Sequence, residues 1–181
     1  MTKLYGGAIS CDLPEVAVDV SDFREVPDTQ EVFILERPDG LDRSVIIDLL
    51  EMVKANTLPE IIAIHLEDII DGPPTFLAPL ESSKTEEDFD AHFFLVKPSP
   101  SKQETDETKL FMLIALLRLE KAESDCVFTF NIPLKCGDVT AEQLHAQMSE
   151  VTSGDGELGR CFQQLKHWVS TFKIQDWNLF S

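Results

Sequence analysis

Two long apolar runs near the middle of the chain constrain its fold more than any other feature. Residues 110–119 and 126–132 are rich in aliphatic and aromatic side chains, and only the polar segment 120–125 separates them. Val127, Phe128 and Phe130 favour a β-strand in the second run. Because the connection is short and polar, the two runs are predicted to form a β-hairpin. Residues 113–119 are strong helix formers, so a helix stays open as an alternative for the first run.

Short apolar runs elsewhere predict further strands. They cover residues 4–13, 30–36, 44–53 and 92–96. In the first of these, Gly6 and Gly7 predict a bulge or a close backbone approach. Residues 44–53 satisfy a buried helix about as well as a buried strand, but the β-branched residues Val45, Ile46 and Ile47 favour the strand.

Helix start signals lie between these strands. The predicted helices are a single turn at residues 19–24 capped by Asp19 or Ser21, a helix that starts at Pro59, one that runs from Thr140 to about residue 150, and one that starts near Asp155. Thr140 and Gln143 form a capping box. Polar residues predict an exposed loop at 81–90 and a long flexible connection at 97–108.

Helices placed among runs of strands, without strict alternation, favour an α+β fold with a mainly antiparallel sheet covered by helices. At 181 residues, one domain spanning residues 1–181 is the expectation.

The chain is strongly acidic, with 33 Asp and Glu against 15 Lys and Arg and a formal net charge of −18. Nucleic acid and anionic membranes normally require a basic patch, so neither is expected as a partner. A basic protein would be attracted, although acidity also serves solubility alone. No signal peptide, C-x-x-C pair or run of about 18 apolar residues is visible, which predicts a cytosolic or nuclear protein with reduced thiols.

No motif in the chain supports catalysis, a metal site or a cofactor. Residues 154–159 match G-x-G-x-x-G, but a polar, helix-like segment precedes them where a dinucleotide loop needs a strand. Asp155 and Glu157 would also repel a pyrophosphate. His65, Glu67 and Asp68 are too close in sequence to converge on a helix, and His65 is predicted to be a core histidine. An enzyme is therefore not expected.

The segment with the most distinctive chemistry is residues 22–33, which mixes charges with apolar residues. Phe23, Val26, Val32 and Phe33 are expected to root it in the core, with the charged side chains facing outward. Pro27 and Asp28 signal a stiff turn. The candidate partner-binding residues, here called the acidic corner, are Arg24, Glu25, Pro27, Asp28, Gln30 and Glu31. The alternative is that these charges are simply solvated.

The acidic corner, with residues 4–9 before it and 44–51 after it, resembles the Ran guanine nucleotide release factor family of nuclear import proteins. The segment 26–32 is the specific part of the resemblance. Further similar segments are 65–68, 116–119, 129–133 and 178–180.

The resemblance implies a PsbP-like α/β/α sandwich, with an antiparallel sheet of about six strands flanked by helices on both faces. It also implies binding to the small GTPase Ran and promotion of nucleotide release from it, in the nucleus and cytoplasm. Within the family, Asp28 and Glu31 would contribute to Ran binding, and other nuclear transport factors are further candidate partners. A non-catalytic acidic adaptor for another basic protein is the alternative.

Overall fold

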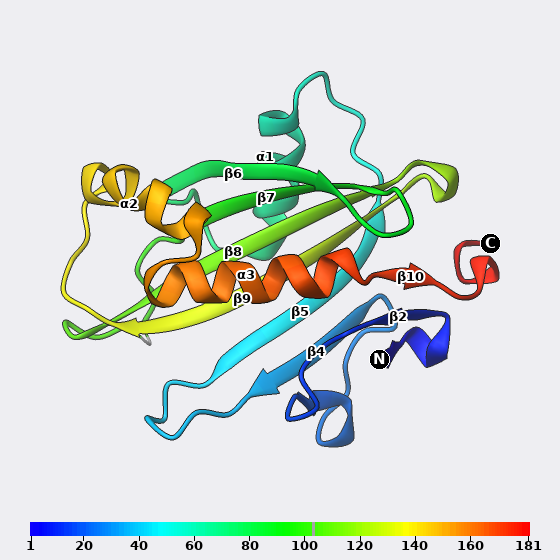
Figure 1. Cartoon of the computed structure of the whole chain (residues 1–181), viewed down its shortest axis with the longest axis horizontal. Coiled ribbons are helices and arrows are strands. Elements are labelled where there is room, and N and C mark those ends of the chain that lie inside the picture. Colours follow the sequence, from blue (N-terminus) through cyan, green and yellow to red (C-terminus); the bar gives the residue numbers. More distant parts are fainter. Residues whose placement is uncertain (103) are drawn as a thin grey trace.

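A computed structural model describes residues 1–102 and 104–181. Within these residues a seven-stranded antiparallel sheet has the order β3-β4-β5-β9-β8-β7-β6 (Figure 1). Its strands are β3 Val18–Asp19, β4 Gln30–Leu35, β5 Arg43–Glu51, β6 Phe76–Lys84, β7 Asp90–Lys97, β8 Thr108–Leu119 and β9 Ser124–Lys135. The sheet has one strand more than expected because the two-residue β3 pairs with the outer edge of β4.

The predicted hairpin is formed by β8 and β9, whose register pairs Leu113 with Phe130 and Leu116 with Val127. Residues 111–117 are all buried, so this stretch of β8 contacts apolar groups on both faces of the sheet. A continuous apolar run is the pattern of a strand covered on both faces. This burial outweighs the helix propensity of the leucines, and the helical alternative is wrong.

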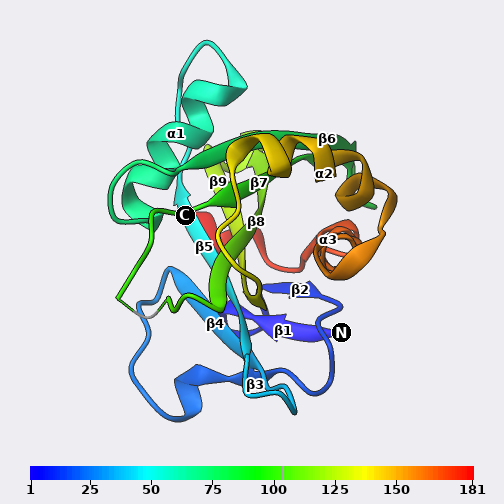
Figure 2. The ribbon, with the colours of Figure 1, turned by 90° about the vertical axis from the view of Figure 1, so that its left-hand side faces the viewer.

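Helices cover both faces of the sheet, as expected for an α/β/α sandwich (Figure 2). On one face, Ile62 and Leu66 of α1 (Leu58–Ile69) belong to a cluster with Phe94, Ile114 and Val127. We call this the α1 face. Because successive strand residues point to opposite sides, the neighbours Phe93 and Phe128 face the other way.

That second face, the α3 face, holds the larger core. Phe162 and Leu165 of α3 (Gly156–Ser170) pack there, with Phe162 at 5.6 Å from Phe93 between ring centroids. Helix α2 (Ala141–Ser153) lies beside α3 and near β6. The amphipathic pattern predicted for the last helix is confirmed because its apolar positions are buried.

Local signals account for where the helices begin and end. Thr57 and Glu60 form a capping box ahead of α1, and Thr140 and Gln143 form the predicted one ahead of α2. Gly154 ends α2 with a φ of 90°, a left-handed conformation that favours glycine. A Cβ on Gly159 would lie 2.5 Å from the carbonyl carbon of Gly154. The glycines of the G-x-G-x-x-G match therefore include two that serve a tight corner between two helices.

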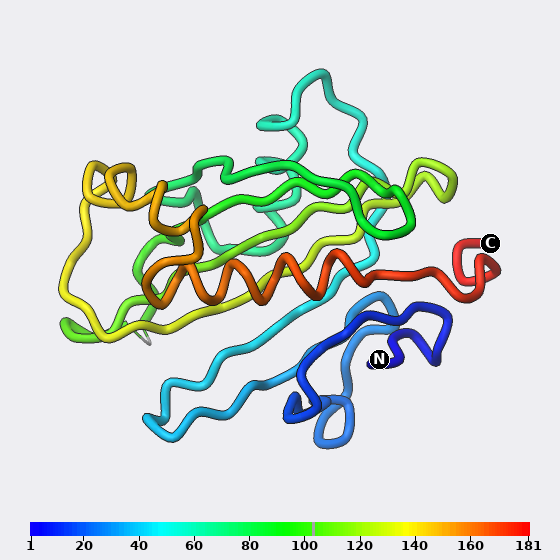
Figure 3. The backbone as a smooth tube through the Cα atoms, in the orientation of Figure 1, coloured from blue at the N-terminus to red at the C-terminus, as the bar shows by residue number. Residues whose placement is uncertain are grey.

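The N-terminal segment differs from the single strand predicted over residues 4–13. It forms two short strands, β1 (Thr2–Leu4) and β2 (Ile9–Cys11), joined by a 3-10 turn over Tyr5–Gly7. Gly6 and Gly7 have φ of 65° and 97°, so the two glycines reverse the chain where a bulge or a close backbone approach was predicted. β10 (Lys173–Ile174) pairs with β2 and completes a three-stranded sheet from the two ends of the described chain (Figure 3).

The loop predicted at residues 81–90 is also shorter than expected. β6 continues to Lys84 and β7 begins at Asp90, so only residues 85–89 form the turn. β6 is an edge strand, and an edge strand tolerates the polar residues that in the sequence favour a loop. The connection between β7 and β8 is confirmed at residues 98–102 and 104–107.

Candidate functional site

The acidic corner is a turn that leads into β4. Asp19 caps the 3-10 helix η2 (Val20–Asp22) by accepting a 2.9 Å hydrogen bond from the N–H of Ser21, as predicted. An extended segment follows. The N–H of Gln30 then donates to the carbonyl oxygen of Pro27 at 2.9 Å and closes the predicted turn at the start of the strand.

Most of the acidic corner is exposed. Arg24, Glu25, Pro27 and Asp28 all lie at the surface. The side chains of Arg24, Glu25 and Asp28 form no hydrogen bond or ion pair with any residue that the structure describes. Their charges are therefore available to a partner, which is the arrangement that the sequence predicted for them.

Glu31 differs from this prediction because its carboxylate is used inside the molecule. The side chain is half-buried, and its Oε1 accepts a hydrogen bond from the backbone N–H of Tyr5. Burial raises the pKa of Glu31 above its ordinary value, the Tyr5 N–H opposes this rise, and the charge of Asp19 adds to it. Glu31 thus links the N-terminal hairpin to β4, and it does not simply face outward.

Tyr5 was missed by the sequence reasoning, although it belongs to a segment of the family resemblance. Its hydroxyl donates to the carbonyl oxygens of Ile47 at 2.7 Å and Thr29 at 3.2 Å. Burial raises the pKa of the phenol strongly, so the group stays a hydrogen-bond donor. Its backbone φ of 50° is unusual for a residue other than glycine. Tyr5 therefore fixes the start of β4 to both β5 and the hairpin.

Gln30 points to the opposite face of the sheet from Glu31, since neighbouring strand residues alternate. Its Nε2 donates to Oδ1 of Asp48 across the β4–β5 pair at 2.8 Å. Burial raises the pKa of Asp48, and the Gln30 hydrogen bond and the charge of His65 oppose the rise. The residues of the acidic corner therefore do not share one surface: Glu31 lies on the α3 face and Gln30 on the α1 face, and the others lie in or before the turn. Asp48, which the sequence analysis did not single out, is bonded to Gln30.

Phe23 contradicts the expectation that it anchors the corner in the core, because it is 77% exposed. Val26 is half-buried, whereas Val32 and Phe33 are buried as predicted. Phe23 stands at a recess of about 910 Å³, here called the Phe23 recess. The recess is lined by Val18, Val20, Phe23, Arg24, Val32, Ile34, Glu36, Ser44 and Ile46.

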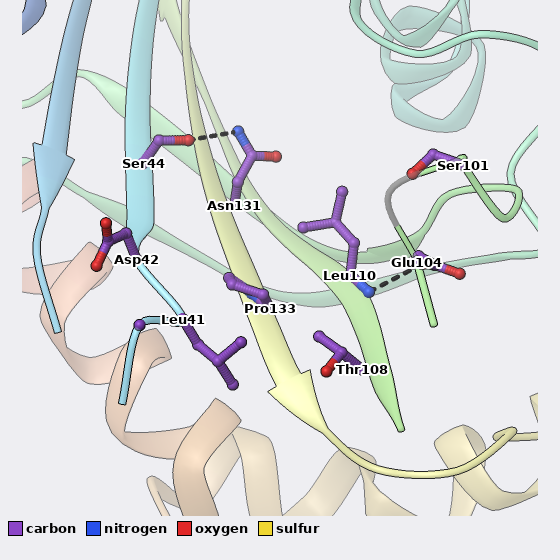
Figure 4. A pocket seen from close by; sticks show the side chains of 10 residues that line it. Leu41, Asp42, Ser44, Ser101, Glu104, Thr108, Leu110, Asn131 and Pro133 are labelled. Atoms are coloured by element: carbon purple, nitrogen blue, oxygen red, sulfur yellow. Dashed lines mark hydrogen bonds between the residues drawn. The ribbon is translucent and has the colours of Figure 1, made fainter. Parts of the chain in front are cut away.

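A second cavity of about 520 Å³ shares Ser44 with the Phe23 recess (Figure 4). In it, Nδ2 of Asn131 donates to Oγ of Ser44 at 3.1 Å, and Oδ1 of Asn131 is buried without a hydrogen-bond partner. Asp42 and Leu110 line the same cavity. We call it the Asn131 cavity.

One carboxylate oxygen of Glu104, on the wall of the Asn131 cavity, already has partners, and the other, Oε2, is buried without one. Its Oε1 accepts from Nζ of Lys97 at 2.7 Å and from the N–H of Leu110 at 2.8 Å. Burial opposes ionisation, but these two donors hold the pKa of Glu104 below its ordinary value. Glu104 is therefore an anion that holds its own loop against β8.

His65 is a core histidine, as predicted, and Glu67 and Asp68 are exposed. Its Nε2 lies 2.7 Å from Oδ2 of Asp125, a fully buried carboxylate that also accepts from Nη1 of Arg118 and from the N–H of Val53, each at 3.0 Å. This cluster joins α1 to the sheet.

Among the described residues, no group of three or more His, Cys, Asp and Glu could hold a metal ion, and no helix there is long and apolar enough to span a membrane. Cys11, Cys126, Cys136 and Cys161 are all free thiols, as predicted.

The antiparallel sheet between helices is a Mog1-like α+β fold. It matches the crystal structure of the Ran-binding protein Mog1p of Saccharomyces cerevisiae with a TM-score of 0.69 and 28% sequence identity, over 99% of this chain and 97% of that one. The family model described as Ran-interacting Mog1 protein matches residues 2–133. The chain therefore belongs to the Mog1 family, whose members include Ran guanine nucleotide release factors.

Similar curated proteins carry names from the same family. The nuclear import protein MOG1 of S. cerevisiae is 31% identical over 99% of this chain and 84% of its own length. A probable Ran guanine nucleotide release factor of Dictyostelium discoideum is 30% identical over 98% and 94%. The human Ran guanine nucleotide release factor is 36% identical over 72% and 74%. These matches confirm the resemblance, while the role of the acidic corner stays a prediction.

Proposed function

We propose that this protein binds the small GTPase Ran and promotes release of its guanine nucleotide, in support of nuclear import in the nucleus and cytoplasm. Membership of the Mog1 family and the names of its relatives support the partner. The observation that carries the site is the exposed, unpaired carboxylate of Asp28 on a closed turn. A carboxylate held this way can meet a cation without first breaking an internal ion pair.

Nucleotide release requires differential binding. A GTPase holds its nucleotide through phosphate contacts, Mg²⁺ and a lysine. A partner that binds the nucleotide-free form more tightly shifts the equilibrium toward release, whereas equal affinity for both forms releases nothing. Asp28 is placed to pair with a basic group on Ran or to compete for that lysine. No chemistry of the protein's own is needed.

Glu31 has a different role in this proposal. One carboxylate oxygen holds the N–H of Tyr5, so the side chain keeps the turn at a fixed position relative to the N-terminal hairpin. Its half-buried site leaves it less accessible to a partner than Asp28. Replacing Glu31 should therefore weaken binding mainly by loosening the corner, and Glu31→Gln, which keeps an acceptor for Tyr5, should cost less than Glu31→Ala.

The net charge of −18 supports a basic partner surface through long-range steering. Such steering acts on the association rate and is screened by salt over about 8 Å at physiological ionic strength. The association rate with Ran should therefore fall as salt is added.

The test is release of labelled nucleotide from purified Ran, with and without the protein. The double variant Asp28→Ala, Glu31→Ala should lose most of the stimulation, and Glu150→Ala, an exposed acid on α2, should keep it. An unchanged release rate with the folded double variant would refute the assignment of the site. An unmodified protein that neither binds Ran nor changes nucleotide release would instead favour the acidic adaptor for another basic protein.

A further inference from the structure

The α1 face is only partly covered by α1. The apolar cluster under the helix takes in residues of β7, β8 and β9 and the partly buried Leu77 of β6, and among the described residues its member from β5 is the partly buried Leu50. Strands β4 and β5 extend well beyond the helix (Figure 2). The Phe23 recess lies on this extension, directly after the acidic corner along β4. An apolar surface is thus continuous with the proposed Ran-binding turn.

Phe23 is held in place although it is exposed. Its N–H donates to the carbonyl oxygen of Val20 at 3.0 Å, and the N–H of Arg24 donates to the same oxygen at 3.1 Å. The turn of η2 that carries it is capped by Asp19. An aromatic side chain on an ordered turn loses little freedom on binding, and aromatic residues are enriched among the residues that dominate binding energy.

The surroundings of Phe23 fit an apolar contact with a charged rim. Ile34 and Ile46 are partly exposed in the floor of the recess, above the buried Val32. Arg24 and Glu36 are the charged residues that line the recess, and acidic residues flank Phe23 in the sequence at positions 19, 22, 25 and 28. Apolar centres with polar rims are typical of protein interfaces. This rim selects a partner surface with an apolar residue beside basic ones.

The far end of the same surface carries a different chemistry. Beyond Ser44, Oδ1 of Asn131 is buried without a partner and points into the Asn131 cavity, whereas the carboxylate of Asp42 is turned away from Asn131 and its Oδ1 accepts from the N–H of Arg37 at 2.8 Å (Figure 4). An unpaired amide oxygen can accept a hydrogen bond from an ammonium or guanidinium group. Leu110 and Pro133 line the cavity and could contact the aliphatic stem of a lysine or arginine.

We propose that the surface from Phe23 to Asn131 is a second contact for the same partner and binds a segment with an apolar side chain and a lysine or arginine. The apolar side chain packs against Phe23, Ile34 and Ile46, and the basic one reaches Oδ1 of Asn131. The identity of the partner rests on the proposed function. The inference adds that the acidic corner is one end of a longer contact surface.

The test is the dissociation constant for nucleotide-free Ran, measured by calorimetry or interferometry. Phe23→Ala should weaken binding about tenfold or more, as truncation of a central aromatic contact does. Asn131→Leu should weaken it less, by about threefold, through loss of one acceptor. Ile64→Ala, which removes an apolar side chain that is 44% exposed on α1, is the matched control and should bind like the unmodified protein.

The possible results separate the two proposals. If the unmodified protein binds Ran and Phe23→Ala binds equally well, the second contact is refuted and the proposed function stands. If the unmodified protein does not bind Ran, both proposals fail. Thermal unfolding of each variant checks the fold, and Phe23→Ala should unfold at the same temperature as the unmodified protein because the side chain is exposed.

Discussion

Replacing Asp125 by alanine should destabilise the protein more than loss of any surface carboxylate. The side chain is 0% exposed, and its Oδ2 accepts from donors on three different elements. These are His65 on α1, Arg118 on β8 and the backbone of Val53 after β5. The substitution removes the acceptor of the Arg118 guanidinium, whose side chain is 15% exposed, and of the backbone N–H of Val53.

Breaking a buried ion pair by removing one partner costs about 3–5 kcal/mol. Part of this is offset in Asp125→Ala, because Oδ1 of Asp125 has no hydrogen-bond partner and its burial already costs about 1–3 kcal/mol. The central values, about 4 and about 2 kcal/mol, leave a fall of about 2 kcal/mol in the free energy of unfolding. For a protein of this size, 1 kcal/mol corresponds to about 2–4 °C, so the unfolding midpoint should fall by roughly 4–8 °C.

Urea denaturation followed by circular dichroism measures the free energy, and calorimetry measures the midpoint. Asp138→Ala is the matched control, since Asp138 is paired with Lys109 at 3.0 Å but its side chain is 98% exposed. That substitution should cost less than about 1 kcal/mol. A loss below about 1 kcal/mol for Asp125→Ala would refute the idea that this carboxylate joins α1 to the sheet.

Three further predictions concern other residues. Tyr5→Phe removes a hydroxyl bonded to two backbone carbonyls and should lower the free energy of unfolding by about 1–2 kcal/mol. Denaturant titration measures this, and an unchanged free energy would contradict the prediction. The stabilisation that Asp48 derives from its raised pKa is present below the ordinary carboxyl pKa of about 3.9 and is lost as pH rises through the raised value. The stability of Asp48→Asn relative to the unmodified protein should therefore increase with pH across that window, and a constant difference would contradict this. Gly159→Ala places a Cβ 2.5 Å from the carbonyl carbon of Gly154 and should lower the free energy of unfolding by at least about 2 kcal/mol. Gly137→Ala, whose Cβ would have nothing within 4 Å, is the control and should leave the unfolding temperature in a thermal melt almost unchanged.

Much of the fold could be predicted because its signals are local. The β8–β9 hairpin follows from two apolar runs around a short polar connection, and Thr140 with Gln143 marks the start of α2 within four residues. The core position of His65 follows from helical periodicity. The α3 helix was predicted in the same way. Its buried positions recur every three or four residues.

The candidate site was predicted less completely because its geometry depends on distant contacts. Glu31 and Tyr5 are 26 residues apart, and nothing in either segment shows that the N-terminal hairpin will lie against β4. Phe23 is apolar and was assigned to the core by residue type, but α1 stops short of the strand that Phe23 borders. Asp48 lies within an apolar run and was not singled out. A lone charged residue in such a run is the signal that could have marked it as a buried polar group.

The pairing of β10 with β2 determines when the acidic corner can become fully ordered during synthesis of the chain. β2 pairs with Lys173–Ile174 only after these residues have left the ribosome, and the N–H of Gln175 then donates to the carbonyl oxygen of Ala8 at 2.8 Å. Tyr5, which fixes the corner, is on the hairpin that this late step completes. A nascent chain with its larger sheet already folded would therefore still lack a fully ordered corner, which delays engagement of any partner until β10 has been synthesised.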